Sequence, residues 1–525
     1  MHFTPRLASS FRLVRKPQLR KAFLYGSGAI AVGGGVAVVR SVDSIEDLKE
    51  IGLIRFGRAV VTVGKIIVDY KTSLKGLDDL SEEYARKIKE CHKRSAEHLL
   101  DLSHKNGGVF IKVGQHIAAM EYLVPPEYTD TLNVLMSKAP QASFEDVKFV
   151  IEDELGKPIE EIFDKFDKTP VGAASLAQVH PAYLKGTGEK VAVKVQHRRV
   201  LKNSRTDMNT MELLVNIADK LFPEFRLMWL VKEVKKNLPN ELNFLHEAEN
   251  ADRVRKMFAH LPFLKIPKII YDLSTPRVLT MEFCEGAQVD DVNYMKANNI
   301  NRHDICKKMA KMISEMIFLA GYLHADPHAG NVLINKVNGQ TQIVLLDHGL
   351  YLDMDEKFKR LYSELWIALL DANQERIKKV ATQMGVGELY GLFACIVTRR
   401  SWKAVTEGIN KSKIDKSEKE ELRQYAVSLI PQISEVLSRM PREMLLILKT
   451  NDLLRNLEHQ LNVFGRDDSL IEMSKCVIRS NYDTSLKASQ SYINSFLVRV
   501  HYFWYYLQIR TYELFLISKD CLGLN

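Results

Sequence analysis

The chain has 525 residues, of which 46% are hydrophobic and 26% charged, a composition that excludes a collagenous or wholly disordered protein. Its length fits three or four average domains, or a two-lobed enzyme with terminal extensions. With 74 basic and 65 acidic residues the formal net charge is +9, which is typical of proteins that bind nucleic acid or acidic membranes, or of chains whose charge is unevenly distributed. The six cysteines lie far apart, so neither a zinc site nor a disulfide framework is predicted.

The excess positive charge lies at the N-terminus. Residues 1–42 contain seven basic residues and no acidic one, so the rest of the chain carries 67 basic and 65 acidic residues. Arg12, Lys16 and Arg20 recur every four residues and would share one helix face, which is typical of a mitochondrial transit peptide. Pro17 would interrupt that helix, and a disordered basic tail is the alternative. Because the body is nearly neutral, no nucleic-acid partner is expected.

An uncharged segment of 18 residues, 22–39, follows the basic stretch. At 1.5 Å per residue a helix of this length barely spans a hydrocarbon core of about 30 Å. Its glycines also lower the helix propensity, although small residues are common where membrane helices pack. We interpret the segment as a marginal membrane segment, with a flexible linker as the alternative.

Helical patterns dominate the first part of the chain. Apolar residues recur at the helical period in three stretches, 43–102, 109–120 and 144–155. From 172 to 195 the pattern changes to short apolar runs separated by glycines, and 191–195 is predicted to be a strand. The change of period indicates that a mixed region follows the N-terminal helices.

Beyond this region, strands are predicted over 266–272 and 278–283, and long helices over 304–323 and over most of the chain after Asp355. Strand-rich stretches followed by helices predict a small mixed lobe and a larger helical lobe. A last helix is predicted over 492–517. Its aromatic residues suit a membrane interface, but its three charged residues favour packing against the helical lobe.

The most specific stretch is His-Ala-Asp-Pro-His-Ala-Gly-Asn over 324–331, which an apolar run and then Asp-His-Gly over 347–349 follow. An Asp, an Asn five residues later and an Asp-x-Gly after an apolar strand form the layout used for phosphoryl transfer. In that layout Asp326 lies near the accepting hydroxyl, while Asn331 and Asp347 supply oxygen ligands for magnesium. The alternative is a polar turn between two core strands, because these residue types also favour turns.

Two stretches upstream follow the order found in nucleotide-binding kinases. Lys194 lies on the predicted strand where a lysine contacts nucleotide phosphates. Some twenty residues earlier, Ala173, Ala174 and Ser175 occupy the place of a glycine-rich phosphate loop. Each added methyl group limits close approach of the backbone to phosphate, so nucleotide binding should differ from that of an ordinary kinase. Where the strand at 278–283 would enter an adenine-binding hinge, the candidate contacts are Glu282 and Cys284.

With these motifs in this order, the sequence resembles the UbiB family of atypical kinases, also called the aarF-domain-containing kinases. That family has a Lys-x-Gly-Gln motif on an added N-terminal helix, present here as Lys112-Val113-Gly114-Gln115. The resemblance implies an α+β, two-lobed fold like that of atypical protein kinases, with added N-terminal helices and a mostly helical C-lobe. It also implies ATP or ADP and Mg²⁺ as ligands, and a motif-bearing helix that folds over the active site.

The resemblance further implies roles for individual residues. Lys194 would hold the α- and β-phosphates and pair with Glu247. Asp326 would be the catalytic-loop aspartate, and Asn331 and Asp347 would bind magnesium. The organisation expected from it is a targeting segment over 1–42, a helical extension with the Lys-x-Gly-Gln motif over 43–155, a kinase-like N-lobe with a helical insert over 156–287 and a helical C-lobe over 288–525.

Two positions depart from the family pattern. A Glu-x-Asp motif usually precedes the helix glutamate, but this chain reads Glu241-Leu242-Asn243, which removes the charge that a metal or lysine contact would use. Glu241 can still pair with Lys112, which shares a helix face with Gln115. The second departure is His348 in place of the usual phenylalanine, which leaves the metal ligand intact and alters its packing.

The substrate is not predicted to be a protein, because no Ala-Pro-Glu element or long activation segment follows Gly349. A small or lipid-like substrate, or a nucleotide-driven conformational role, is favoured. The resemblance implies a part in mitochondrial lipid or quinone homeostasis, with association at the inner membrane. An active kinase or ATPase is one hypothesis, and a nucleotide-binding pseudokinase that serves as a scaffold or lipid-handling module is the alternative.

Overall fold

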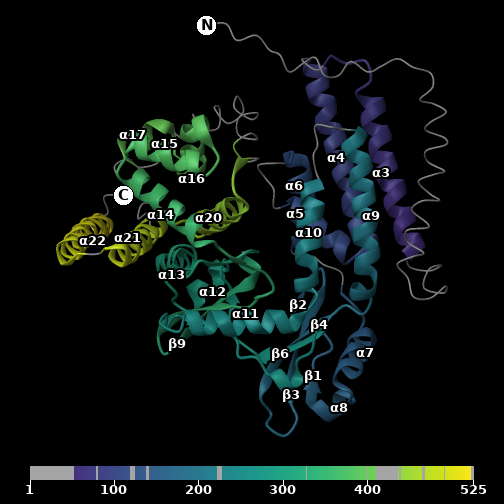
Figure 1. Cartoon of the computed structure of the whole chain (residues 1–525). Coiled ribbons are helices and arrows are strands. Elements are labelled where there is room, and N and C mark those ends of the chain that lie inside the picture. Colours follow the sequence, from purple (N-terminus) through teal and green to yellow (C-terminus); the bar gives the residue numbers. More distant parts are fainter. Residues whose placement is uncertain are drawn as a thin grey trace. The chain divides into compact units, whose positions relative to one another are not determined.

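The computed structural model describes residues 52–78, 81–118, 124–136, 141–221, 228–326, 328–398, 400–408, 436, 439–463, 468–489 and 491–521. The predicted targeting segment and membrane segment lie outside these residues. The chain forms two compact units (Figure 1). The first unit runs to His246 and also includes Ile269–Phe283, whereas the second comprises Glu247–Lys268 and the chain from Cys284 onwards.

The first unit contains helices that run side by side (Figure 1). They are α3 (Leu53–Ser73), α4 (Glu82–Asn106), α5 (Val109–Ala118), the short α6 (Pro126–Leu132) with the 3₁₀ turn η2 (Asn133–Met136), α9 (Val200–Leu221) and α10 (Met228–Glu241). The boundaries of α4 follow from local chemistry. The Ser81 hydroxyl accepts from the backbone N–H of Tyr84 at the start, and Gly107, at φ 64°, ends the helix. Buried apolar residues from α3, α4, α5, α9 and α10 form one core.

The first unit also holds an antiparallel sheet of five strands, β1 (Phe163–Phe166), β2 (Gly172–Ala173), β3 (Ala177–Leu184), β4 (Lys190–Gln196) and β6 (Val278–Glu282). Their order is β1-β3-β4-β6, with β2 beside β3. Val191, Val193 and Val195 of β4 are buried against α7 (Phe144–Leu155) and α8 (Ile159–Ile162). Because successive side chains of a strand alternate, Lys194 lies on the opposite face of β4 from these valines.

Helix α11 (Phe244–Met257) leads into the second unit, which contains two small sheets. The larger sheet has the order β5-β10-β9-β7, and the smaller one pairs β11 with β8. Their bounds are β5 (Leu264–Lys265), β7 (Ala287–Gln288), β8 (Tyr322–His324), β9 (Val332–Val337), β10 (Gln340–Leu345) and β11 (Tyr351–Asp353). The helices are α12 (Val292–Ala297), α13 (Arg302–Glu315), α14 (Glu356–Leu370), α15 (Gln374–Gln383), α16 (Tyr390–Thr398), α17 (Trp402–Glu407), α20 (Arg442–Gln460), α21 (Asp468–Ala488) and α22 (Tyr492–Cys521).

One strand prediction was wrong, and one predicted helix is confirmed except for its last three residues. In place of the strand predicted over 266–272 the structure has a single bridge at Ile269 and the 3₁₀ turn η3 (Tyr271–Leu273), and the two-residue strand β5 lies just before this stretch. Pro267 lacks the N–H that a continuous strand would donate. The helix predicted over 304–323 ends in a π-helical turn, η4 (Met316–Ala320), because Gly321 adopts a left-handed conformation at φ 66° and the chain enters β8.

The predicted C-terminal helix is confirmed and packs against the helical part of the second unit. Within the contact between α22 and α21, the rings of Tyr502 and Tyr482 lie 4.5 Å apart. The other face of α22 leaves large apolar side chains such as Phe496 and Phe503 mostly exposed. Among the described residues, no helix combines the length and apolar character needed to cross a membrane.

Candidate active site

Three residues of the predicted phosphoryl-transfer motif lie close together in the second unit. Asn331 Nδ2 lies 3.4 Å from Asp347 Oδ2 and 3.4 Å from the backbone oxygen of Asp326. Asn331 ends the 3₁₀ turn η5 (Ala329–Asn331) just before β9, and Asp347 follows the paired strand β10. The backbone N–H of Leu346 donates to Asn331 O at 2.9 Å. The paired strands therefore hold the amide and the carboxylate at the same end of the sheet.

His324 links the two loops that carry these residues. Its side chain is buried, with Nε2 2.9 Å from the backbone oxygen of Asp347 and Nδ1 3.2 Å from the backbone nitrogen of Asp326. The backbone N–H of Asp326 can only donate, so Nδ1 accepts and Nε2–H donates to Asp347 O. Burial lowers the pKa of His324, which favours the neutral imidazole that this bonding requires.

Asp326 forms an ion pair with Lys449 of α20. The distance from Lys449 Nζ to Asp326 Oδ1 is 2.8 Å, and both side chains are about three-quarters buried. A charge-assisted hydrogen bond of this length restricts the orientation of the carboxylate. Lys449 lies 123 residues after Asp326 and belongs to no local motif, so sequence reasoning missed it and had no signal from which to find it.

Glu247 of α11 approaches the same region of the second unit. A side-chain carbon added at Gly349 would lie 3.2 Å from Asp347 Oδ1 and 3.8 Å from Glu247 Oε2, so the glycine leaves room between two carboxylates. The N–H of Gly349 donates to Asp347 Oδ1 at 2.9 Å. Three residues beyond Glu247 on α11, Asn250 donates through Nδ2 to His348 O at 2.9 Å. These contacts tie α11 to the Asp347 loop.

The histidine that replaces the usual phenylalanine has its own bonding partners. His348 is 2% exposed, with Nε2 3.1 Å from the backbone oxygen of Leu345 and Nδ1 2.9 Å from the hydroxyl of Tyr351. The carbonyl can only accept, so Nε2–H donates to it and the tyrosine hydroxyl donates to Nδ1. A phenylalanine would fill this position without making either bond. The substitution therefore changes how the loop is held and leaves Asp347 in place.

The oxygen donors fit a magnesium ion that arrives with a nucleotide. Asp347 offers a carboxylate, and a half-turn of the Asn331 amide presents its oxygen in place of Nδ2. In the described part of the chain, no group of three or more His, Cys, Asp or Glu side chains could hold a metal alone. Magnesium commonly takes one or two carboxylates and completes its shell with phosphate oxygens and water, which suits this sparse donor set.

Lys194 lies in the middle of the sheet of the first unit. It is opposite Val179 of β3 and Leu279 of β6 in the strand register. Its Nζ lies 5.3 Å from the centre of the Phe244 ring. Two paired strands fix the backbone of this lysine, so the position from which its side chain projects is well defined.

The predicted alanine-rich loop connects β2 to β3 in the same sheet. Ala173 is opposite Gln178, and the N–H of Ala174 donates to Ala177 O at 2.8 Å, which closes a tight turn that also contains the buried Ser175. His197, just after β4, lies with Nε2 3.1 Å from Ala174 O. The loop is thus held by its own turn and by a residue that follows the strand of Lys194.

The Lys-x-Gly-Gln motif lies on α5 and holds together parts of the first unit. Lys112 Nζ is 2.9 Å from Glu241 Oε2 at the end of α10, in a largely buried ion pair. Gln115 donates through Nε2 to the backbone oxygen of Leu135 at 2.8 Å. A Cβ at Gly114 would lie only 2.4 Å from Leu135 Cδ1. The motif glycine therefore permits the close contact between α5 and η2.

Asn243, which replaces the family aspartate, lies directly before α11. Its Oδ1 accepts from the backbone N–H of Leu245 at 3.2 Å, and its side chain is exposed. This is the bond that an Asx residue makes at the start of a helix, and asparagine makes it as well as aspartate does. The substitution removes a charge and keeps the helix start.

The two candidate adenine contacts lie where the chain passes from one unit to the other. Glu282 is the last residue of β6, opposite Val191 of β4, and Cys284 is a partly buried thiol just after the first unit ends. Gly286 follows at φ 153°, where a Cβ would lie 2.7 Å from the backbone oxygen of Ile334. The glycine is needed for this close approach of two backbone segments.

The predicted residues thus fall into two groups. The first unit brings Lys112 to Glu241. It also places Lys194 on β4, beside β3, and the alanine-rich loop joins β2 to β3. The second unit brings Asp326, Asn331, Asp347 and Glu247 into one region. The expected pair of Lys194 with Glu247 joins residues of different units and stays a prediction.

A lysine-bearing antiparallel sheet, together with an Asp-Asn loop and an Asp-x-Gly turn, defines a kinase-like protein of an atypical kind. A family model described as the ABC1 atypical kinase-like domain matches residues 134–381. The chain is 46% identical over 506 residues to AarF domain-containing protein kinase 1 of Gallus gallus, covering 95% of this chain and 96% of that protein. It is 44% identical over 506 residues to AarF domain-containing kinase 1 of Drosophila melanogaster, covering 95% and 97%. The chain therefore belongs to the ABC1/AarF family of atypical kinases.

A solved structure of a Mycobacterium tuberculosis protein in complex with erythromycin is similar at a lower level. Its TM-score is 0.46 and its sequence identity 21%, with 73% of this chain and 95% of that chain covered. The sequence relatives establish the family membership, and the family membership confirms the predicted α+β kinase-like fold.

Proposed function

We propose that the chain binds a magnesium nucleotide and transfers or hydrolyses its terminal phosphate. The observation that carries this proposal is the group formed by Asp326, Asn331 and Asp347, which His324 links within the second unit. Phosphoryl transfer is catalysed mainly by positioning and charge neutralisation. Asn331 and Asp347 would hold the ion, which when bound neutralises charge on the phosphate oxygens.

The protein's own residues would do the remaining work. Asp326, whose carboxylate Lys449 restrains, would accept the proton of the attacking hydroxyl. Lys194, fixed between two strands, would neutralise the other phosphates. The methyl groups of Ala173 and Ala174 would keep the backbone farther from phosphate than glycines do, so nucleotide affinity or preference should differ from that of an ordinary kinase.

The acceptor in this proposal is small or lipid-like. The segment after Gly349 supports it, because Tyr351–Asp353 pairs with β8 as strand β11 and α14 begins at Glu356. That leaves little chain for the peptide platform of protein kinases. The exposed aromatic side chains of α22, among them Phe503 and Trp504, support a membrane surface as partner. Mitochondrial inner-membrane association and a part in lipid or quinone homeostasis complete the proposal.

Thermal melting of the full chain tests nucleotide binding. Mg-ATP at about a hundred times its dissociation constant should stabilise the protein by about 2.7 kcal/mol. Asp347→Asn should lose most of that stabilisation, because it removes the ligand carboxylate. Asp483→Asn, which changes an exposed carboxylate on α21, is the matched control and should respond like the wild type. No stabilisation of the wild-type chain by Mg-ATP would rule the proposal out.

ATP hydrolysis in the presence of lipid vesicles then separates enzyme from scaffold. Asp326→Asn and Lys194→Ala should each reduce the hydrolysis rate by roughly 10²-fold or more. Binding without hydrolysis in the wild type would favour the pseudokinase alternative, for which the altered Asn243 and the alanine loop are the supporting observations. Hydrolysis that survives both substitutions would contradict the assigned mechanism.

A further inference from the structure

The helices of the first unit enclose a cavity of about 270 Å³. Helices α3, α4, α5, α6, α9 and α10 all contribute to its wall. Among the described residues that line it, every side chain apart from those of Tyr70, Ser103 and Tyr128 is apolar or absent, and none is charged. Native cores contain few voids larger than a water molecule, whereas apolar cavities with a few polar groups are the usual form of small-molecule sites.

The dimensions of the cavity set the size of an occupant. An apolar cavity of about 150 Å³ holds one benzene molecule, so this one, nearly twice as large, accommodates about ten carbon atoms. On α3 the lining runs from Val63 to Tyr70, which spans about 10 Å along the helix and favours a chain over a compact ring. Lining residues such as Ile66, Val113 and Val124 are half-buried, so within the described part of the chain the cavity reaches the surface.

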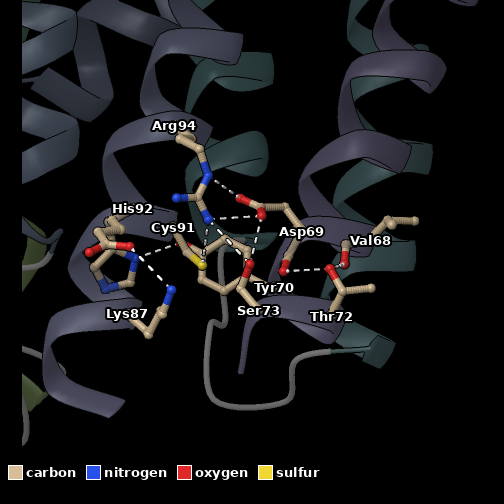
Figure 2. Close-up of polar contacts among 10 residues, drawn as sticks. Val68, Asp69, Tyr70, Thr72, Ser73, Lys87, Cys91, His92 and Arg94 are labelled. Atoms are coloured by element: carbon tan, nitrogen blue, oxygen red, sulfur yellow. Dashed lines mark hydrogen bonds and ion pairs between the residues drawn. The ribbon is translucent and has the colours of Figure 1, made fainter. Parts of the chain in front are cut away.

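One end of the cavity is polar. The hydroxyls of Tyr70 and Tyr128 lie 2.9 Å apart, and the Tyr70 hydroxyl also contacts His92 Nδ1. Figure 2 shows His92 and Tyr70 beside Arg94, whose guanidinium donates to Asp69 and so joins α4 to α3 next to this end. The polar end is therefore built on two helices that are held together.

The polar end is also uncharged. Burial raises the pKa of Tyr70 and that of Tyr128, and burial lowers the pKa of His92. All three groups are therefore neutral near pH 7. A charged head group placed here would lose its hydration without meeting an opposite charge among the described lining residues, which is strongly unfavourable.

We propose that this cavity binds one uncharged amphipathic molecule, with an aliphatic or isoprenoid chain of about ten carbons between the helices and a hydroxyl or carbonyl at the Tyr70–Tyr128 pair. Helix α5 gives such binding a consequence. Val113 and Ile117 line the cavity, while Lys112 of the same helix holds Glu241, so an occupant bears directly on the helix of the Lys-x-Gly-Gln motif. The site uses none of the nucleotide-handling residues, and only its physiological role rests on the proposed function.

Melting of the full chain without nucleotide tests the site with 1-decanol, geraniol and decanoate as probes. We expect 1-decanol or geraniol to raise the melting temperature in a saturable manner. A larger response to 1-decanol would indicate a linear chain, and a larger response to geraniol would indicate an isoprenoid chain. Decanoate should bind at least tenfold more weakly, because its carboxylate is charged. No saturable response to either alcohol, or equal affinity for decanoate, would overturn the proposal.

A matched pair of substitutions on α3 locates the binding. Val63→Phe fills the cavity, whereas Val61→Phe adds the same atoms on the exposed face of the same helix. Val63→Phe should lose the response to alcohol and Val61→Phe should keep it. Val215→Phe on α9 is a second filling variant, for use if Val63→Phe does not fold. A response that survives filling, or that Val61→Phe also loses, would contradict the site.

Two further variants test the head-group contact and whether the site is independent of the nucleotide-binding residues. Tyr128→Phe should weaken 1-decanol binding severalfold and leave binding of decane unchanged, since only the alcohol uses the hydroxyl. Lys194→Ala should retain the full response to 1-decanol, because it lies outside the cavity. Equal weakening of decane and 1-decanol by Tyr128→Phe would overturn the assigned head-group contact. Because these measurements are made without nucleotide, a failure of this site can be distinguished from a failure of nucleotide binding.

Discussion

Position 114 has no room for a larger residue than glycine, because Leu135 occupies the space where a side chain would lie. The Cβ of an alanine would lie 2.4 Å from Leu135 Cδ1 and 3.4 Å from Ser103 Oγ, so the fully buried Leu135 side chain, or the helices themselves, would have to shift. We expect Gly114→Ala to lower the free energy of unfolding by about 1–3 kcal/mol, the usual range for overpacking. Urea denaturation followed by circular dichroism measures this change.

Gly64, a helical glycine of α3, is the matched control at the residue scale. A Cβ there meets nothing within 4 Å, so Gly64→Ala should raise stability by about 0.5–1 kcal/mol through helix propensity alone. Equal effects of the two substitutions would show that the contact with Leu135 does not explain the motif glycine.

At the element scale, α22 is anchored through Glu513, which is 6% exposed. Its carboxylate lies 2.6 Å from Lys307 Nζ of α13 and 2.9 Å from Lys475 Nζ of α21. Burial raises the pKa of Glu513, but the hydrogen bonds from the two lysines outweigh that effect and lower the pKa to about 2 from 4.5. The anchor therefore stabilises the fold fully above pH 4.5 and is lost as pH falls towards 2.

Melting temperature against pH tests this anchor. The wild-type protein should lose stability as the pH falls from about 4.5 to 2. Glu513→Gln should make that loss smaller by roughly 2 kcal/mol, a value that allows for solvent screening of the half-exposed Lys307. Glu388→Gln, which removes an exposed ion pair with Lys378, should leave the pH profile almost unchanged. An unchanged profile for Glu513→Gln would contradict the role of the buried pair.

At the scale of the whole molecule, seven of the nine net positive charges belong to residues 1–42. If these charges direct the chain to mitochondria, a chain without this segment should not be imported. Replacement of Arg12, Lys16 and Arg20 by glutamine should reduce import, because transit peptides are recognised as basic amphipathic helices. Exchange of Arg for Lys and Lys for Arg at the same positions keeps the charge and should preserve import. Normal import of the glutamine variant in isolated mitochondria would contradict the assignment.

Much of the fold and part of the site could be predicted from local sequence. The strand at 191–195 and the helix at 144–155 were correct, because side-chain periodicity reflects the face that each element buries. The spacing from Asp326 to Asn331 identified a loop whose two residues do lie together. Residues only a few positions apart lie close together in any fold, so contacts between them can be predicted without knowledge of the tertiary structure.

Contacts between distant segments could not be predicted in this way. Lys449 meets Asp326 across 123 residues, and the cavity forms only where six helices from Leu53 to Glu241 pack together. The strand expected over 266–272 failed for a related reason, since its residues are divided between two compact units. Periodicity reports which side of an element is buried but not against what, and that choice depends on how the whole chain packs.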